Sequence, residues 1–243
     1  MNLKNIQQKY INNSTTERYN YGGIPIFCTG GIHENIFNQF KKKNIAKDAN
    51  ILVLGSGPGA FEKRLLDNGY TQITSVEFVA ENFIVKGTNF LSLDLNNDFG
   101  NLGKFDAIFA IELIEHLENP FHFIRCVKEN MKKNGVLYLS TPNTENTFAR
   151  IKYFLIGRLQ WFGLGELEGT GHITPIFNHI LRFNLSQSKL KISKHFSNAN
   201  IWTKLIQHEG IKTKILYALS FIISLFMIHK DNGEINLFEI INE

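Results

Sequence analysis

Five short apolar runs occur between residues 50 and 142, and polar or amphipathic stretches separate them. The runs at 51–54 and 105–111 are almost wholly apolar, which is typical of strands buried on both faces of a parallel sheet. The other predicted strands lie at 72–78, 89–93 and 136–140. Helical spacing of apolar residues predicts helices that begin near Gly31, Pro58 and Pro120. This alternation predicts an α/β fold with a doubly wound, mostly parallel sheet.

The last part of the chain contains two further alternating segments, at 190–195 and 234–241, which predict a sixth and a seventh strand. Between them, residues 215–228 are almost entirely apolar, from Ile215 to Ile228. As a helix they would be about 21 Å long, which is too short for the roughly 30 Å hydrocarbon core of a bilayer. We expect this segment to be buried in the domain or in a homodimer. Its basic flanks leave peripheral contact with an anionic membrane as the alternative.

We predict a single domain over residues 1–243, with an N-terminal arm at 1–30 and a lid at 144–189. Residues 1–20 of the arm are polar and are expected to be loose, whereas residues 21–25 are expected to form a turn. The predicted lid contains glycines at 163, 165, 169 and 171, and we expect a mobile loop there that closes over the substrate. A plain surface loop is the alternative. The first twenty residues lack the apolar stretch of a signal peptide.

The composition describes an ordinary globular protein, since 43% of the 243 residues are hydrophobic and 20% are charged. The formal charge is +4, but no basic stripe with interleaved aromatic residues suggests a nucleic-acid partner. Cys28 and Cys126 have neither metal-binding nor redox spacing. We therefore expect free thiols, a reducing compartment and a cytoplasmic location.

A glycine-rich turn after the first strand is the most informative local motif. Gly55, Gly57 and Gly59 alternate with other residues, and Pro58 suits the first turn of a helix. Glycines let the backbone approach a ligand, and the N–H groups at a helix start attract an electron-rich partner. The pattern fits a dinucleotide-binding turn or the turn of an S-adenosylmethionine (SAM) enzyme, and a turn without ligand is the third possibility. Glu77, about twenty residues later, is placed to bind ribose hydroxyls in either nucleotide scheme.

Further motifs follow the later strands. They are Asp-Leu-Asn at 94–96, Glu-Leu-Ile-Glu-His-Leu-Glu-Asn-Pro at 112–120 and Leu-Ser-Thr-Pro-Asn at 139–143. Together with the glycine turn and Glu77, this ordered set resembles the class I SAM-dependent methyltransferases, in the bacterial branch similar to ubiquinone-type and surface-polysaccharide methyltransferases. The likeness spans residues 31–172, and the ordered set is more specific than any single motif.

The resemblance implies a Rossmann-like, seven-stranded sheet, SAM as the cofactor and methyl transfer as the activity. In the family the glycine turn faces the methionine part of SAM, the acidic residue after the second strand binds ribose, and the Asp after the third strand meets adenine. The implied cofactor-binding residues are Gly55, Ser56, Gly57, Gly59, Glu77, Phe78, Asp94, Leu95, Ile111 and Glu112. The family often has Cys-Gly-Thr where this chain departs from it at 56–58, and this departure leaves the backbone cradle intact.

Methyl transfer to a hydroxyl requires a base, whereas transfer to a neutral amine does not. His116 and His172 are the candidate catalytic bases, because imidazoles titrate near neutral pH and both residues are expected at the open edge of the sheet. Each could instead cap a helix or anchor a loop. Glu112, Glu115 and His116 would share one face of a helical turn and could bind a divalent cation with His172, as in some relatives. We assign no metal ligand, because Glu112 ends a strand and the resemblance implies that these residues serve SAM.

The predicted function is therefore SAM-dependent methyl transfer to a hydroxyl of a small-molecule or sugar-like acceptor. A role in surface-polysaccharide biosynthesis is implied by the resemblance alone. The alternatives are N-methylation of an amine, an NAD-dependent oxidoreductase and a non-catalytic partner protein of the same fold. The oxidoreductase hypothesis does not explain the motifs at 112–120 and 139–143. The intact glycine turn, Glu77 and Asp94 argue against the non-catalytic alternative.

Overall fold

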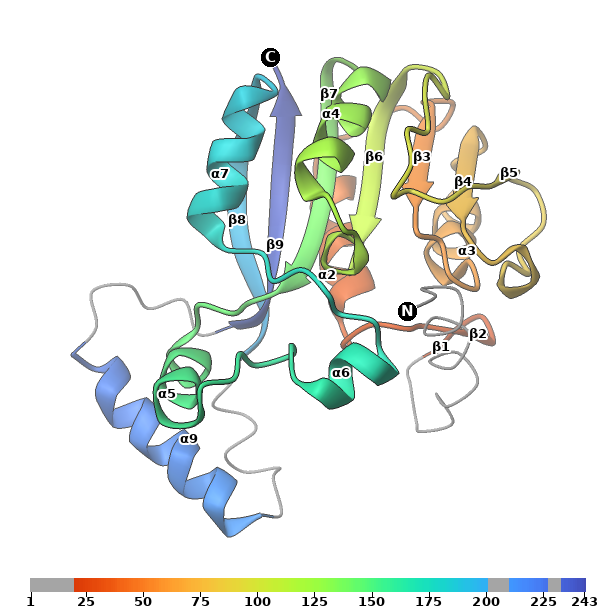
Figure 1. Ribbon diagram of the computed structural model, residues 1–243. Helices are drawn as coiled ribbons and strands as arrows, with labels where there is room; N and C mark the ends of the chain where they lie inside the picture. The colour runs from red at the N-terminus through yellow and green to blue at the C-terminus, as the bar shows by residue number, and fades with distance from the viewer. Residues whose placement is uncertain (1–19, 201–209, 227–232) are drawn as a thin grey trace.

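The computed structural model describes residues 20–200, 210–226 and 233–243 (Figure 1). Most of the predicted arm, and Met227 and Ile228 of the predicted apolar helix, lie outside the described residues. The described end of the arm contains the turn predicted at 21–25. It forms a hairpin of β1 (Asn20–Tyr21) and β2 (Ile24–Pro25), and Ile24 and Ile26 are buried beside Ala60.

One seven-stranded sheet forms the centre of the molecule, in the order β5–β4–β3–β6–β7–β9–β8 (Figure 1). The strands are β3 (Ile51–Leu54), β4 (Ile73–Glu77), β5 (Asn89–Ser92), β6 (Phe105–Ile111), β7 (Met131–Pro142), β8 (Leu190–Asn200) and β9 (Gly233–Asn242). The five strands from β3 to β7 are parallel, whereas β9 runs antiparallel to β7 and to β8. The predicted α/β fold with a mostly parallel, seven-stranded sheet is confirmed.

Helices cover both faces of this sheet. On one face, α2 (Ile32–Lys41) and α3 (Ala60–Asp67) bury an apolar stripe against the strands. On the other face lie α4 (Pro120–Asn130) and α7 (Asn178–Gln187). Asn119 caps α4, since its side-chain oxygen accepts a hydrogen bond from the His122 N–H at 2.9 Å. The centre of the sheet is therefore sheltered from water on both faces, which explains why the central strands β3 and β6 are almost wholly apolar.

The remaining helical elements lie beyond the sheet edge at which β3 and β6 end (Figure 1). They are the 3₁₀ turns η1 (Ala80–Asn82) and η2 (Ile114–His116) and the helices α5 (Thr147–Ile156), α6 (Leu164–Gly169) and α9 (Ile211–Ser224). The short helix α6 replaces the loop that the glycines at 163–171 predicted. The Glu166 carboxylate stabilises its first turn by accepting a hydrogen bond from the Gly163 N–H at 3.1 Å. Whether this segment acts as a lid remains a prediction.

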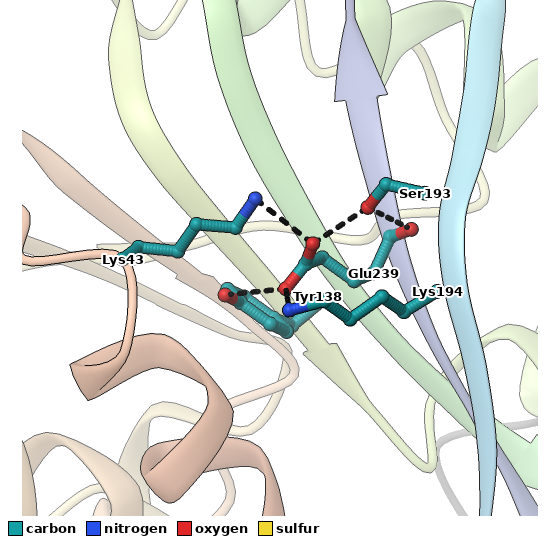
Figure 2. A network of polar contacts seen from close by, with 5 residues as sticks. All are labelled: Lys43, Tyr138, Ser193, Lys194 and Glu239. Atoms are coloured by element: carbon teal, nitrogen blue, oxygen red, sulfur yellow. Dashed lines mark hydrogen bonds and ion pairs between the residues drawn. The ribbon is translucent and has the colours of Figure 1, made fainter.

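A buried carboxylate joins the antiparallel edge of the sheet to the chain after α2 (Figure 2). Lys43 Nζ lies 2.8 Å and Ser193 Oγ 2.6 Å from Glu239 Oε1, and Lys194 Nζ lies 3.4 Å from Oε2. The Tyr138 hydroxyl donates to Oε2 at 3.3 Å. Burial by itself would raise the pKa of Glu239, but the hydrogen bonds and charges of Lys43, Ser193 and Lys194 lower it below its ordinary value.

Helix α9 contradicts the expectation that the apolar segment is buried within the fold. It packs along α5, but most of its large apolar side chains are exposed, including Ile215, Leu219 and Ile222. Of the side chains of α9 that the structure describes, only those of Tyr217, Ser220 and Ser224 are buried. Among the described residues, no helix combines the length and apolarity needed to cross a bilayer.

Candidate functional site

The candidate site lies at the carboxyl ends of β3, β4 and β6. The strand order reverses here, because β3 has β4 on one side and β6 on the other. Loops diverge at such a switch point and leave a crevice in which α/β proteins bind ligands. Three cavities occupy this edge, and we call them the first, second and third cavity.

The glycine turn forms the floor of the first cavity. The N–H groups of Gly55 and Ser56 donate to the Val76 carbonyl at 2.9 and 3.0 Å, which holds the turn against β4. Gly57 has a φ of +53°, and a Cβ built on it would have only Phe27 within 4 Å, at 3.9 Å. A ligand can therefore approach the backbone where any other residue would place a side chain. Of the predicted cofactor-binding residues, Gly55, Ser56, Gly57, Glu77, Ile111 and Glu112 line this cavity.

Gly59 has a different role from the one predicted. It does not line any of the three cavities. Its φ is +95°, and a Cβ would lie 2.5 Å from Val85 Cγ2 and 2.9 Å from Phe83 Cε2. This glycine permits close packing behind the turn, at the start of α3, instead of contact with a ligand.

The second cavity continues from the first on the side of β4 and β5. Phe78, Asp94 and Leu95 line it, and Glu77 lies between the two cavities. The Glu77 carboxylate accepts hydrogen bonds from the Gly57 N–H at 2.8 Å and the Val79 N–H at 3.1 Å. Burial raises its pKa, and these hydrogen bonds oppose the rise. Two cavities joined at a carboxylate suit an elongated ligand with a ribose at its centre.

The third cavity adjoins the first on the side of β7. Trp161, Glu166 and His172 line it, and it shares Glu112 and His116 with the first cavity. The two predicted catalytic histidines, which are far apart in sequence, thus come together with ring centroids 4.9 Å apart. The first and third cavities therefore meet at one wall.

Glu112 has an unusual backbone conformation, with a φ of +50° directly after β6. Its N–H donates to Ser140 Oγ at 2.9 Å, and the Ser140 hydroxyl donates to Glu112 Oε1 at 3.0 Å. Burial raises the pKa of Glu112 to about 8. The prediction that Glu112 shares a helical turn with Glu115 and His116 is wrong. Ser140 holds Glu112 at the end of β6, and η2 begins only at Ile114.

Backbone carbonyls orient both histidines. His116 Nδ1 lies 3.1 Å from the Gly171 carbonyl oxygen, and His172 Nδ1 lies 2.9 Å from that of Trp161. A carbonyl can only accept, so Nδ1 carries the proton and each neutral ring has its lone pair on Nε2. Burial, followed by the neighbouring His172, lowers the pKa of His116 to about 3, and burial lowers that of His172. Both imidazoles are therefore neutral near pH 7.

Glu115 completes a cluster that has the chemistry of a metal site. One ligand atom from each of Glu115, His116 and His172 lies within 4.8 Å of the others. Both carboxyl oxygens of Glu115 are buried without a hydrogen bond of normal geometry among the described residues. Burial, followed by the Glu112 carboxyl, raises the pKa of Glu115 well above its ordinary value. Two neutral imidazoles and a carboxylate are donors that divalent transition metals accept. Of the four residues that the sequence suggested for a metal site, Glu115, His116 and His172 come together, whereas Glu112 is not part of this cluster.

Sequence reasoning missed several residues of the site. Phe27 and Cys28, from the predicted arm, and Thr170 line both the first and the third cavity. No local motif marks them. His33, in the first turn of α2, lines the first cavity, where its buried Nδ1 has no hydrogen bond among the described residues. Burial, followed by the charge of Arg64, lowers the pKa of His33 to about 3.

Comparison with known proteins gives the cavities a context. Residues 32–178 match the model of the family described as "Methyltransferase domain". The chain is 24% identical over 175 residues to the ubiquinone biosynthesis O-methyltransferase of Pelagibacter ubique, covering 65% of this chain and 72% of that protein. It is 30% identical over 128 residues to the enzyme of the same name from Pasteurella multocida, covering 49% and 46%.

The matched stretch spans less than two thirds of several of these relatives, such as the Dictyostelium discoideum enzyme, of which it covers 41%. Among solved structures, a SAM-dependent methyltransferase from Archaeoglobus fulgidus superposes with a TM-score of 0.57 at 15% identity. This superposition covers 87% of this chain and 94% of the archaeal one.

Proposed function

The chain belongs to the methyltransferase domain family, and we propose that it transfers the methyl group of S-adenosyl-L-methionine to a hydroxyl of a small-molecule or sugar-like acceptor. The observation that carries this proposal is the shared wall of the first and third cavities, where Glu112 and His116 face both spaces. A methyl donor in one space and an acceptor in the other would meet there. SAM supplies a methyl group bound to a positively charged sulfur. The acceptor oxygen would attack the methyl carbon in line with the carbon–sulfur bond, and the neutral sulfur of S-adenosylhomocysteine would leave.

The residues of this chain would position the two reactants and remove a proton. The open backbone at Gly57 and the carboxylate of Glu77 would hold the cofactor across the first two cavities. His172, with its lone pair on Nε2, would take up the proton of the acceptor hydroxyl. Because Trp161 fixes Nδ1, the ring keeps one orientation. The low pKa of His116 makes it the weaker base of the pair.

A second role for the same cluster is favoured by the unpaired carboxyl of Glu115. Glu115, His116 and His172 would hold a divalent cation, and such a cation would lower the pKa of a hydroxyl bound beside it. Neutral imidazoles are the form that a metal requires, so the low pKa of His116 suits a ligand better than a base. The two hypotheses use the same residues and differ in whether activity needs a cation.

Oxygen is favoured over nitrogen as the acceptor atom, because the curated relatives are O-methyltransferases by name. N-methylation of an amine is the alternative. A role in surface-polysaccharide biosynthesis is proposed from the resemblance of the sequence motifs alone. The family match supports methyl transfer over the NAD-dependent oxidoreductase and the non-catalytic protein that the sequence left open.

Turnover of the two histidine variants tests the proposal. We expect His172→Asn or His116→Asn to lower kcat at least roughly a hundredfold while the affinity for S-adenosylhomocysteine changes little. His179→Asn, at an exposed position of α7, is the matched control. S-adenosylhomocysteine release is measured with a catechol, a hexose and an alkylamine as acceptors. Methylation of the amine alone, with both variants fully active, would refute O-methylation. A chelator that abolishes turnover, and a divalent ion that restores it, would establish the metal hypothesis.

A further inference from the structure

The helices α5 and α9 pack against each other away from the sheet (Figure 1), and both expose large apolar side chains. We call this exposed surface the α5–α9 face. Its exposed apolar side chains are Tyr153, Phe154, Leu155 and Ile156 on α5, and Ile215, Leu219, Ile222, Leu225 and Phe226 on and just after α9. Phe154 is 87% and Phe226 84% exposed. A soluble protein rarely exposes so many neighbouring large apolar side chains without a use for them.

The polarity of α9 is the reverse of that of a helix on a water-facing surface. Three hydroxyl-bearing side chains of α9 are buried, and one of them, Tyr217, stacks on Phe148 of α5 with ring centroids 4.0 Å apart. The hydroxyls of Ser220 and Ser224 are also buried, and each donates to a backbone carbonyl of the same helix at 2.7 Å. The helix therefore satisfies its hydroxyls internally and directs its apolar side chains outward, as a helix adapted to an apolar exterior does.

The charged side chains of α5 and α9 themselves are all basic. The sequences of α5 and α9 contain no Asp or Glu. Arg150 and Lys152 of α5, Arg158 just after it and Lys214 of α9 form no ion pair within the part of the chain that the structure describes. Lys152 and Arg158 line a groove between α5 and α6. Its one acidic residue, Glu166, already accepts a hydrogen bond from the N–H of Gly163.

We propose that the α5–α9 face binds the surface of an anionic lipid bilayer. The two helices would lie in the plane of the interface, with the apolar side chains among the acyl chains and the cations on the lipid phosphates. This attachment goes beyond the proposed methyl transfer and does not depend on it. A second copy of the chain fits the face less well. A two-fold interface places the same surface of both copies together, so it would gather the basic side chains of both copies without an acidic partner from α5 or α9.

Sedimentation of the full chain with vesicles tests this inference. We expect binding to phosphatidylcholine vesicles that contain about 30 mol% phosphatidylglycerol, weak binding to phosphatidylcholine alone, and release at roughly 0.5 M salt. The variant Phe154→Ser/Ile222→Ser should lose at least tenfold in partitioning. Lys152→Gln/Arg158→Gln should lose roughly tenfold or more on anionic vesicles only.

Matched controls separate the face from general effects. Phe183→Ser removes an aromatic side chain that is 56% exposed on α7, and Lys133→Gln/Lys189→Gln removes two exposed lysines elsewhere. Both should bind vesicles as the wild type does, and thermal unfolding should show every variant folded. Failure of the wild type to bind anionic vesicles would overturn the inference. Vesicle binding by the Phe154→Ser/Ile222→Ser variant equal to that of the wild type would also overturn it. So would light scattering that shows a wild-type dimer and a monomeric Phe154→Ser/Ile222→Ser variant.

Discussion

Substitution of Gly57 by valine separates ligand binding from folding at the glycine turn. A valine at a φ of +53° adopts a backbone conformation that β-branched residues avoid, which costs about 1–3 kcal/mol. For a chain of this size we expect Tm to fall by about 2 to 12 °C. Its Cβ has space in the protein itself, since Phe27 at 3.9 Å is the only neighbour within 4 Å. The added methyl groups therefore fill the first cavity without displacing the core.

Gly100 provides the matched control, because its φ is +60° and a Cβ there would have nothing within 4 Å. Gly100→Val should lose about the same 1–3 kcal/mol of stability, but it lies outside the three cavities. Forcing the cofactor past a valine at Gly57 adds an overpacking cost of about 1–3 kcal/mol or more, so S-adenosylhomocysteine should bind at least roughly fivefold more weakly.

Calorimetric titration with S-adenosylhomocysteine, well below both Tm values, gives the comparison, and a titration with NAD should show no binding. Equal affinity of Gly57→Val and wild type would refute the cofactor assignment of the turn. An equal loss of affinity in Gly100→Val would show that backbone strain, and not the filled cavity, weakens binding.

Three further variants test the rest of the site and the fold. Glu77→Ala should weaken S-adenosylhomocysteine binding by about 1–3 kcal/mol through loss of charged hydrogen bonds, whereas Glu81→Ala, at an exposed position, should not. Glu115→Gln should change the free energy of unfolding by less than about 1 kcal/mol, since its carboxyl has no hydrogen-bond partner among the described residues. It should nonetheless lower Mn²⁺ affinity at least roughly tenfold in a titration, and unchanged affinity would count against the metal hypothesis. Glu239→Gln should cost about 1–3 kcal/mol at pH 7, measured by urea unfolding, while Glu243→Gln, in an exposed ion pair, should have little effect. Because the folded-state pKa of Glu239 is lowered, its contribution is complete above the ordinary value of 4.5 and is lost as the pH falls through the folded-state pKa. A difference between wild type and Glu239→Gln that did not shrink on acidification would contradict this.

The strands and the glycine turn were predictable because their signals are local. Each buried strand has an apolar run of its own, and the turn carries its glycines within five residues. The meeting of His116 with His172 has no such signal, since it depends on how the chain returns through α6 and places the Gly171 carbonyl on His116 Nδ1. The left-handed backbone at Glu112 is equally non-local, because it requires Ser140 on the next strand.

The apolar helix shows the limit of composition as a guide. The apolar composition of residues 215–228 predicts that the segment avoids contact with water. It does not predict which surface covers the segment. The structure pairs α9 with α5, whose own apolar residues from Tyr153 to Ile156 are exposed. Two apolar helices together leave an outer surface, so pairing does not bury either one fully. That outcome depends on the tertiary neighbour, which the helical pattern does not contain.

Phe27 and Cys28 line both the first and the third cavity, and this shared wall links two binding equilibria. If cofactor occupies one side and acceptor the other, any shift of these side chains on binding one ligand alters the affinity for the second. Linkage is reciprocal, so the factor by which the cofactor changes acceptor affinity must equal the factor by which the acceptor changes cofactor affinity. Substitution at Phe27 would then change this coupling, and the affinity of each ligand in the presence of the other would change by the same factor.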